Sequence, residues 1–166
     1  MDFPYYTQKF EAAVRQLNAT SFTEKQLEIK TGIWLESVVL KLQKKTWANN
    51  PDEVFKPGPS IFFSVWIGDQ SLKEGKLLYN IHAFKLRKLK KYAIESRKFA
   101  TAFRTAFKKF EDQWPNVDTK FGPLTLMEGW IVLNEDTLSR DIAVLAQRFS
   151  AIDYLVDDAM DMFKKE

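Results

Sequence analysis

The most constraining feature of this chain of 166 residues is a long apolar row near its C-terminal end. Its members alternate spacings of four and three, which places them on one face of a helix. They are Leu138, Ile142, Leu145, Phe149, Ile152, Val156, Ala159 and Phe163. A helix carrying them has about 28 residues and is about 40 Å long. We therefore predict a long amphipathic C-terminal helix, packed either on a sheet of the same chain or on a second copy of it.

Two shorter apolar rows predict two more helices. The first row is Tyr6, Phe10, Val14 and Leu17, and it predicts a helix over residues 3–18 that Asp2 caps. The second row consists only of phenylalanines: Phe99, Phe103, Phe107 and Phe110. We expect this helix to begin at Ser96 and to end at Trp114-Pro115, because proline cannot continue a helix.

Strands are predicted where β-branched and aromatic residues cluster or alternate with polar ones. The predicted strands cover residues 34–46, 61–67, 77–86 and 124–133. Residues 21–33 remain open: an earlier strand that turns at Thr31-Gly32 and a helix over 23–31 both fit. Residues 48–60 contain three prolines and a glycine and are predicted to form a loop.

The order of these elements predicts the fold class. It is α-β-β-β-α-β-α, without repeats or an interior linker, so we expect one α+β domain over residues 1–166. The expected architecture is a single small sheet of four to five mainly antiparallel strands with helices packed on it, ending in the long helix.

Composition excludes several kinds of site. The chain has no cysteine, which rules out disulfides and thiolate ligands, and it has one histidine, His82. Nucleotide loops of the Rossmann or P-loop type and the Gly-x-Ser-x-Gly pattern are missing from the sequence. We therefore expect no resident metal or cofactor and no catalytic set. The first residues lack the pattern of a secretory signal, and no apolar run approaches the ~20 residues that span a bilayer, so the cytoplasm is the expected location.

Five polar residues could nevertheless form a site. His82 lies on the same strand face as Asn80, and three acids fall on or at the ends of strands: Glu36, Asp69 and Glu128. Acids are uncommon on strands, so a cluster of them would indicate hydrolytic chemistry or metal binding. The alternative is that they form surface pairs, with His82 on a solvated face.

Three tryptophans, Trp34, Trp47 and Trp66, are placed on two strands that could be neighbours. In that arrangement they could line a pocket for an apolar or planar ligand. The alternative is that they fill the core over a small sheet.

Charge is strongly segregated along the chain. Residues 85–109 hold ten lysines and arginines against Glu95 alone, whereas the chain from residue 134 onward carries a net charge of minus four, from eight acids and four bases. The predicted binding residues are Lys85, Arg87, Lys88, Lys90, Lys91, Arg97 and Lys98. Such a stripe attracts phosphate backbones or an acidic protein, or it pairs with the acidic terminal helix of the same chain or of a partner.

These observations favour a non-enzymatic binding or interaction module. We expect it to self-associate as a homodimer through the C-terminal helix and to contact an acidic partner through the basic stripe. The alternative is a nucleic-acid-binding protein or a catalytically degenerate nuclease, because the element order is also that of restriction-endonuclease-like enzymes. Those enzymes need carboxylates on adjacent strands for Mg²⁺, and the strand around His82 carries none.

Overall fold

The computed structural model describes residues 1–56 and 58–166. Within this part of the chain, five strands form one sheet in the order β1-β2-β3-β4-β5, and every neighbouring pair is antiparallel. The strands are β1 (Glu28–Trp34), β2 (Ser37–Gln43), β3 (Ser60–Ile67), β4 (Lys76–Phe84) and β5 (Thr125–Val132). The predicted α+β class, with a small antiparallel sheet, is confirmed.

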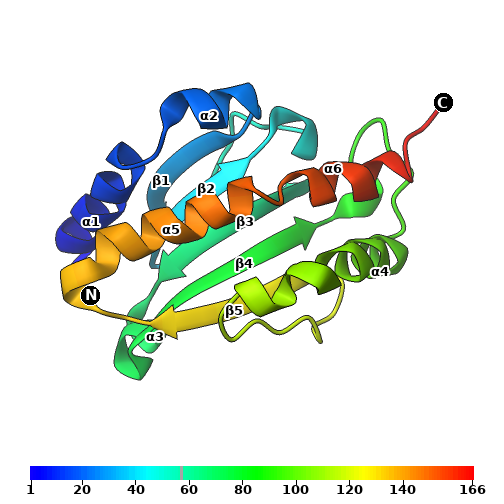
Figure 1. Ribbon diagram of the computed structural model, residues 1–166. Coiled ribbons are helices and arrows are strands. Elements are labelled where there is room, and N and C mark those ends of the chain that lie inside the picture. The colour runs from blue at the N-terminus through cyan, green and yellow to red at the C-terminus, as the bar shows by residue number, and fades with distance from the viewer. Residues whose placement is uncertain (57) are drawn as a thin grey trace.

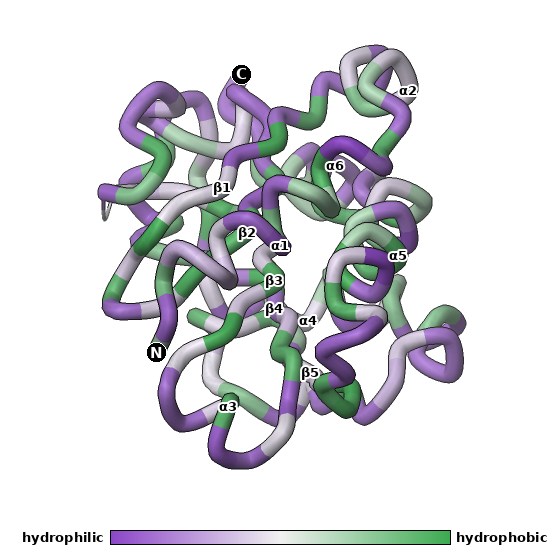
Figure 2. The backbone as a smooth tube through the Cα atoms, turned by 90° about the vertical axis from the view of Figure 1, so that its left-hand side faces the viewer, coloured by the Kyte–Doolittle hydropathy of each residue, from purple (hydrophilic) through white to green (hydrophobic). Residues whose placement is uncertain are grey.

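The longer helices gather on one face of this sheet. They are α1 (Phe3–Arg15), α4 (Ser96–Phe107), α5 (Leu138–Ser150) and α6 (Tyr154–Asp161). Helices α5 and α6 run along the strands in Figure 1, and Figure 2 shows both helices on one side of β1 to β4. Shorter elements connect the rest: α2 (Ala19–Glu24), α3 (Asp69–Glu74) and the 3₁₀-helices η1 (Lys45–Trp47), η2 (Leu86–Lys88), η3 (Lys108–Gln113) and η4 (Glu135–Thr137).

The long C-terminal helix is confirmed, with a short turn at residues 151–153 between α5 and α6. Its apolar row from Leu138 to Ala159 is buried in the core, with no member more than 4% exposed. Of the two expected roles for the row, packing on the chain's own sheet is therefore the one observed. None of the described helices is both long and apolar enough to cross a bilayer.

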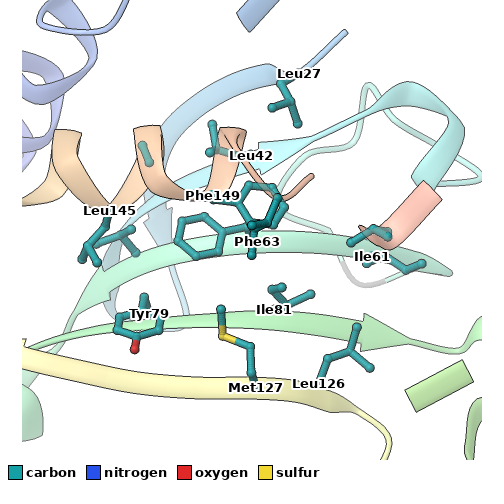
Figure 3. Packing of buried hydrophobic residues seen from close by; sticks show 14 of the residues in the cluster. Leu27, Leu42, Ile61, Phe63, Tyr79, Ile81, Leu126, Met127, Leu145 and Phe149 are labelled. Atoms are coloured by element: carbon teal, nitrogen blue, oxygen red, sulfur yellow. The ribbon is translucent and has the colours of Figure 1, made fainter. Parts of the chain in front are cut away.

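Aromatic rings pack against one another within a core that also contains many aliphatic side chains. Phe149 of α5 stacks on Phe63 of β3 with ring centroids 4.5 Å apart, and Figure 3 shows the two facing each other across the interface. Tyr79 of β4 reaches beneath β5, where its hydroxyl donates to the carbonyl of Pro115 at 2.6 Å. Only a glycine fits at position 129 above it, because a Cβ there would lie 2.2 Å from the Tyr79 oxygen.

The prediction for the first hairpin was wrong in detail. The predicted strand over 34–46 is in fact β2 together with the last residue of β1, and the turn lies at Leu35-Glu36 instead of Thr31-Gly32. Both turn residues adopt the left-handed conformation, with φ of 50° and 60°. Gly32 instead lies within β1, where the ring of Phe55 occupies the space that a Cβ would need.

Candidate functional site: a hollow on the open face of the sheet

The candidate site lies on the face of the sheet opposite the long helices. Alternation along β2 directs Val38, Leu40 and Leu42 toward the helices, so Val39 and Lys41 point to the other side. We call this second side the open face. The cross-strand register aligns its residues in rows, one of which is Lys41, Ser64, Asn80 and Glu128.

Two adjoining cavities indent the open face. The first has a volume of about 350 Å³ and the second about 250 Å³, within or close to the size range of small-molecule sites. Both are lined by Trp34, Leu35, Phe62 and His82. The first is completed by Ser37, Val39, Ser64, Trp66 and Asn80, and the second by Lys41, Val54, Lys56, Gly58, Ser60 and Phe84.

The shared wall of the cavities is aromatic. Phe62 lies at its centre, with ring centroids 5.9 Å from Trp34 in an edge-to-face contact and 5.4 Å from His82. His82 in turn stacks on Phe84 at 6.4 Å. Such a set of rings offers flat contact area that loses little side-chain entropy when a ligand binds.

A short polar chain crosses the floor of the first cavity. The Ser64 hydroxyl donates to Oδ1 of Asn80 at 2.5 Å, and Asn80 lies opposite Glu128 of β5 in the cross-strand register. Burial raises the pKa of Glu128, the neighbouring Asn80 side chain offsets part of that change, and the nearby charge of Asp118 adds to it. The chain fixes the orientation of Asn80, whose side chain faces the cavity.

Among the described residues that line these two cavities, Lys41 is the only buried lysine, with 5% of the residue exposed. It donates to the carbonyl oxygen of Val54, and its Nζ lies 4.1 Å from the centroid of the Phe62 ring. Burial lowers its pKa from 10.5 to about 8. Lys41 forms no ion pair with any carboxylate in the described part of the chain.

Other charged groups surround Lys41 at a greater distance. Glu28 and Lys30 line one small hollow beside it, and Glu53 and Lys56 line another. Within the two main cavities the ionisable lining groups are Lys41, Lys56 and His82, and neither cavity is lined by a described carboxylate. Burial, and then the charge of Lys41, lower the pKa of His82, so this imidazole is neutral at pH 7.

The structure brings together three of the five predicted polar residues. Asn80, His82 and Glu128 share the open face, and His82 is half-buried instead of solvated. Glu36 is exposed in the first hairpin turn, and Asp69 begins α3, where it pairs with the terminal amine of Met1 at 3.3 Å. Neither lines the cavities, so the three strand-borne acids do not converge on one site.

Two of the three tryptophans line a cavity, and the third does not. Trp34 and Trp66 line the first cavity, from β1 and β3. Trp47 belongs instead to η1 and is buried in the core, where its indole nitrogen donates to Asp157 at 2.7 Å. Trp47 was predicted to lie on a strand, but the chain turns away after β2 to form η1.

Two acids of the terminal helix pair with a lysine that the sequence did not indicate as their partner. Asp153 and Asp157 both pair with Lys44, at 2.9 and 2.5 Å. The basic stripe therefore does not serve these two acids. All seven predicted binding residues of the stripe are exposed, and Lys98 pairs with Glu95 at 3.2 Å.

Sequence reasoning missed Lys41, Phe62, Ser64 and Phe84 as parts of a site. The available signal was the alternation along β2, which already placed Lys41 opposite Leu40 and Leu42. Among the described residues, no group of three or more acids or histidines is arranged to hold a metal ion. Comparison of the chain with protein-family models, curated proteins and solved structures finds no match.

Proposed function

We propose that this protein is a binding module whose open face holds a small planar ligand. The observation that carries the proposal is the pair of adjoining cavities with a shared aromatic wall. Trp34 and His82 each pack against the ring of Phe62, and all three rings line both cavities. Concave, largely apolar cavities with aromatic walls and a few oriented polar groups are typical of small-molecule sites.

The polar groups on the floor favour binding over catalysis. The Ser64 hydroxyl donates to Oδ1 of Asn80, an amide oxygen that does not act as a general base. Glu128 contacts Asn80 and lines neither cavity. Oriented amide and hydroxyl groups of this kind select a ligand by its hydrogen-bonding edge.

The test is a ligand-observed NMR screen of planar aromatic fragments against the wild type and two variants. Trp34→Ala removes part of the cavity wall, and Trp130→Ala removes an equal ring from the same sheet face outside both cavities. We expect fragments that bind the wild type and Trp130→Ala but are lost with Trp34→Ala. A screen in which no fragment depends on Trp34 would refute the proposal.

A second candidate function is binding of an acidic partner by the basic stripe between Lys85 and Lys98. Exposure of all seven side chains supports it, because solvated cations can reach phosphates or carboxylates. Labelled single-stranded RNA and polyglutamate would test it in gel-shift and anisotropy assays. We expect salt-dependent binding that Lys88→Glu, Lys90→Glu and Lys91→Glu together abolish. The matched control changes Lys9, Lys73 and Lys120 to Glu, and equal loss in both triple variants would contradict the assignment.

We also propose a cytoplasmic location and a homodimer. A cytoplasmic location is consistent with the cysteine-free sequence. A homodimer through the C-terminal helix would have to use side chains outside its buried row, such as the exposed Val144 and Tyr154. Light scattering at two protein concentrations would test the second of these.

A further inference from the structure

We infer that the ligand of the open face is a planar aromatic acid whose anionic group binds against Lys41. This inference rests on the proposed function and specifies its ligand class. It follows from the position of one buried cation, from the charges that line the cavities, and from the way the two cavities adjoin.

Lys41 has no carboxylate partner among the described residues. The residue is 5% exposed, and a buried ammonium is costly unless a carboxylate or several hydrogen bonds compensate it. Lys41 has one carbonyl acceptor, from Val54, and one ring face, from Phe62. An ammonium has three donors, so this environment leaves capacity for an anion.

The two main cavities carry positive charge at their walls. Neither main cavity is lined by a described carboxylate, and Lys56 adds a second cation at the wall of the same cavity as Lys41. Lys56 is largely exposed and lies 3.6 Å from Glu53, so its charge is already partly balanced. Charge complementarity therefore selects an anion over a cation or a neutral ligand, with Lys41 as its main partner.

The way in which the two cavities adjoin sets the shape of the ligand. The two cavities share Trp34, Phe62 and His82, so a molecule can lie along this wall and extend into both. Its ring would occupy the first cavity, beside the Ser64–Asn80 pair, and its anionic group the second, beside Lys41. The required class is a flat ring system with a carboxylate or phosphate at one end.

Two matched pairs of probes test the inference, and they separate the two sources of this chemistry. One pair is 2-naphthoate and its neutral amide, 2-naphthamide; the other is adenosine 5′-monophosphate and adenosine. Calorimetry at pH 7 should show one acid binding at least about tenfold more tightly than its neutral partner, as expected for a charge-assisted hydrogen bond. The pair that shows the preference identifies the source as an aromatic carboxylate or a nucleoside phosphate.

The variant Lys41→Met should remove this preference, while Lys73→Met, an exposed lysine on α3, should keep it. Equal affinity for acid and neutral partner in the wild type would overturn the inference and leave the proposed function standing. A preference that persists in Lys41→Met would also overturn it, because the charge would then act from elsewhere. If neither acid binds at millimolar concentration, the inference fails, and the Trp34-dependent fragment screen decides separately on the function.

Discussion

Replacement of Lys41 by methionine should stabilise this protein, although it removes a native hydrogen bond. Burial lowers the pKa of Lys41 from 10.5 to about 8. Each unit of difference corresponds to about 1.4 kcal/mol, so keeping the ammonium charged at pH 7 costs the folded state about 3 kcal/mol relative to the neutral amine. Loss of the bond to Val54 offsets about 1 kcal/mol of the gain. We expect Lys41→Met to raise the free energy of unfolding by about 2 kcal/mol at pH 7.

The difference in stability between Lys41→Met and the wild type should also depend on pH. Between pH 8 and 10.5 the unfolded chain keeps its proton on Lys41 while the folded chain has released it, so wild-type stability rises with pH in this window. The variant lacks this contribution. Its advantage should therefore shrink by about 2 kcal/mol between pH 7 and pH 10.

Urea denaturation followed by tryptophan fluorescence at both pH values measures these differences, with Lys73→Met as the control for an exposed lysine. Comparison of each variant with the wild type cancels the titration of all other groups. The reasoning is refuted if Lys41→Met is the less stable protein at pH 7, or if its difference from the wild type is the same at both pH values.

Three further predictions concern other parts of the structure. Binding of the preferred acid should weaken as pH rises through about 8, where Lys41 loses its proton, while binding of its neutral partner stays the same; calorimetry at pH 7 and 9 decides this. Gly129→Ala should cost about 3 kcal/mol in urea denaturation, because the new methyl group would meet the Tyr79 hydroxyl, whereas Gly122→Ala, with open space around it, should cost far less. Asp157→Ala should lower the free energy of unfolding by about 2 kcal/mol and change Trp47 fluorescence, because Lys44 loses one carboxylate and the indole loses its acceptor. Asp158→Ala, at an exposed acid, is the control, and equal effects of the two variants would contradict the assignment.

The regular parts of the fold could be predicted because their periodicity is strong. The phenylalanine row of α4 and the row from Leu138 to Ala159 follow one helical face, and the structure buries that face. The first hairpin could not be predicted in the same way. Two-residue turns favour Asn and Gly, which adopt positive φ readily, but here Leu35 and Glu36 do so. Gly32, which looks like a turn residue, is in a strand because Phe55 packs against it.

The site was harder to predict than the fold, because burial of the second sheet face is a tertiary property. Alternation along β2 told which residues share a face with Lys41, but not that this face would be hollowed and lined by rings. Strand β3 is buried on both of its faces, from Ser60 to Ile67 with one exception. Its sequence therefore shows no alternation that would separate Phe62 from Phe63. Trp34 and Trp66 could be proposed as pocket residues from their type alone, and Trp47 could not be told apart from them.

The meander order of the sheet has a consequence for folding during synthesis on the ribosome. Every strand pairs with its neighbour in the chain, so the whole sheet can assemble before residues 138–161 emerge from the exit tunnel. Until then, Phe63 and the other side chains that face α5 are without their cover. A sheet that pairs before α5 docks exposes an apolar face, the kind of surface that chaperones recognise.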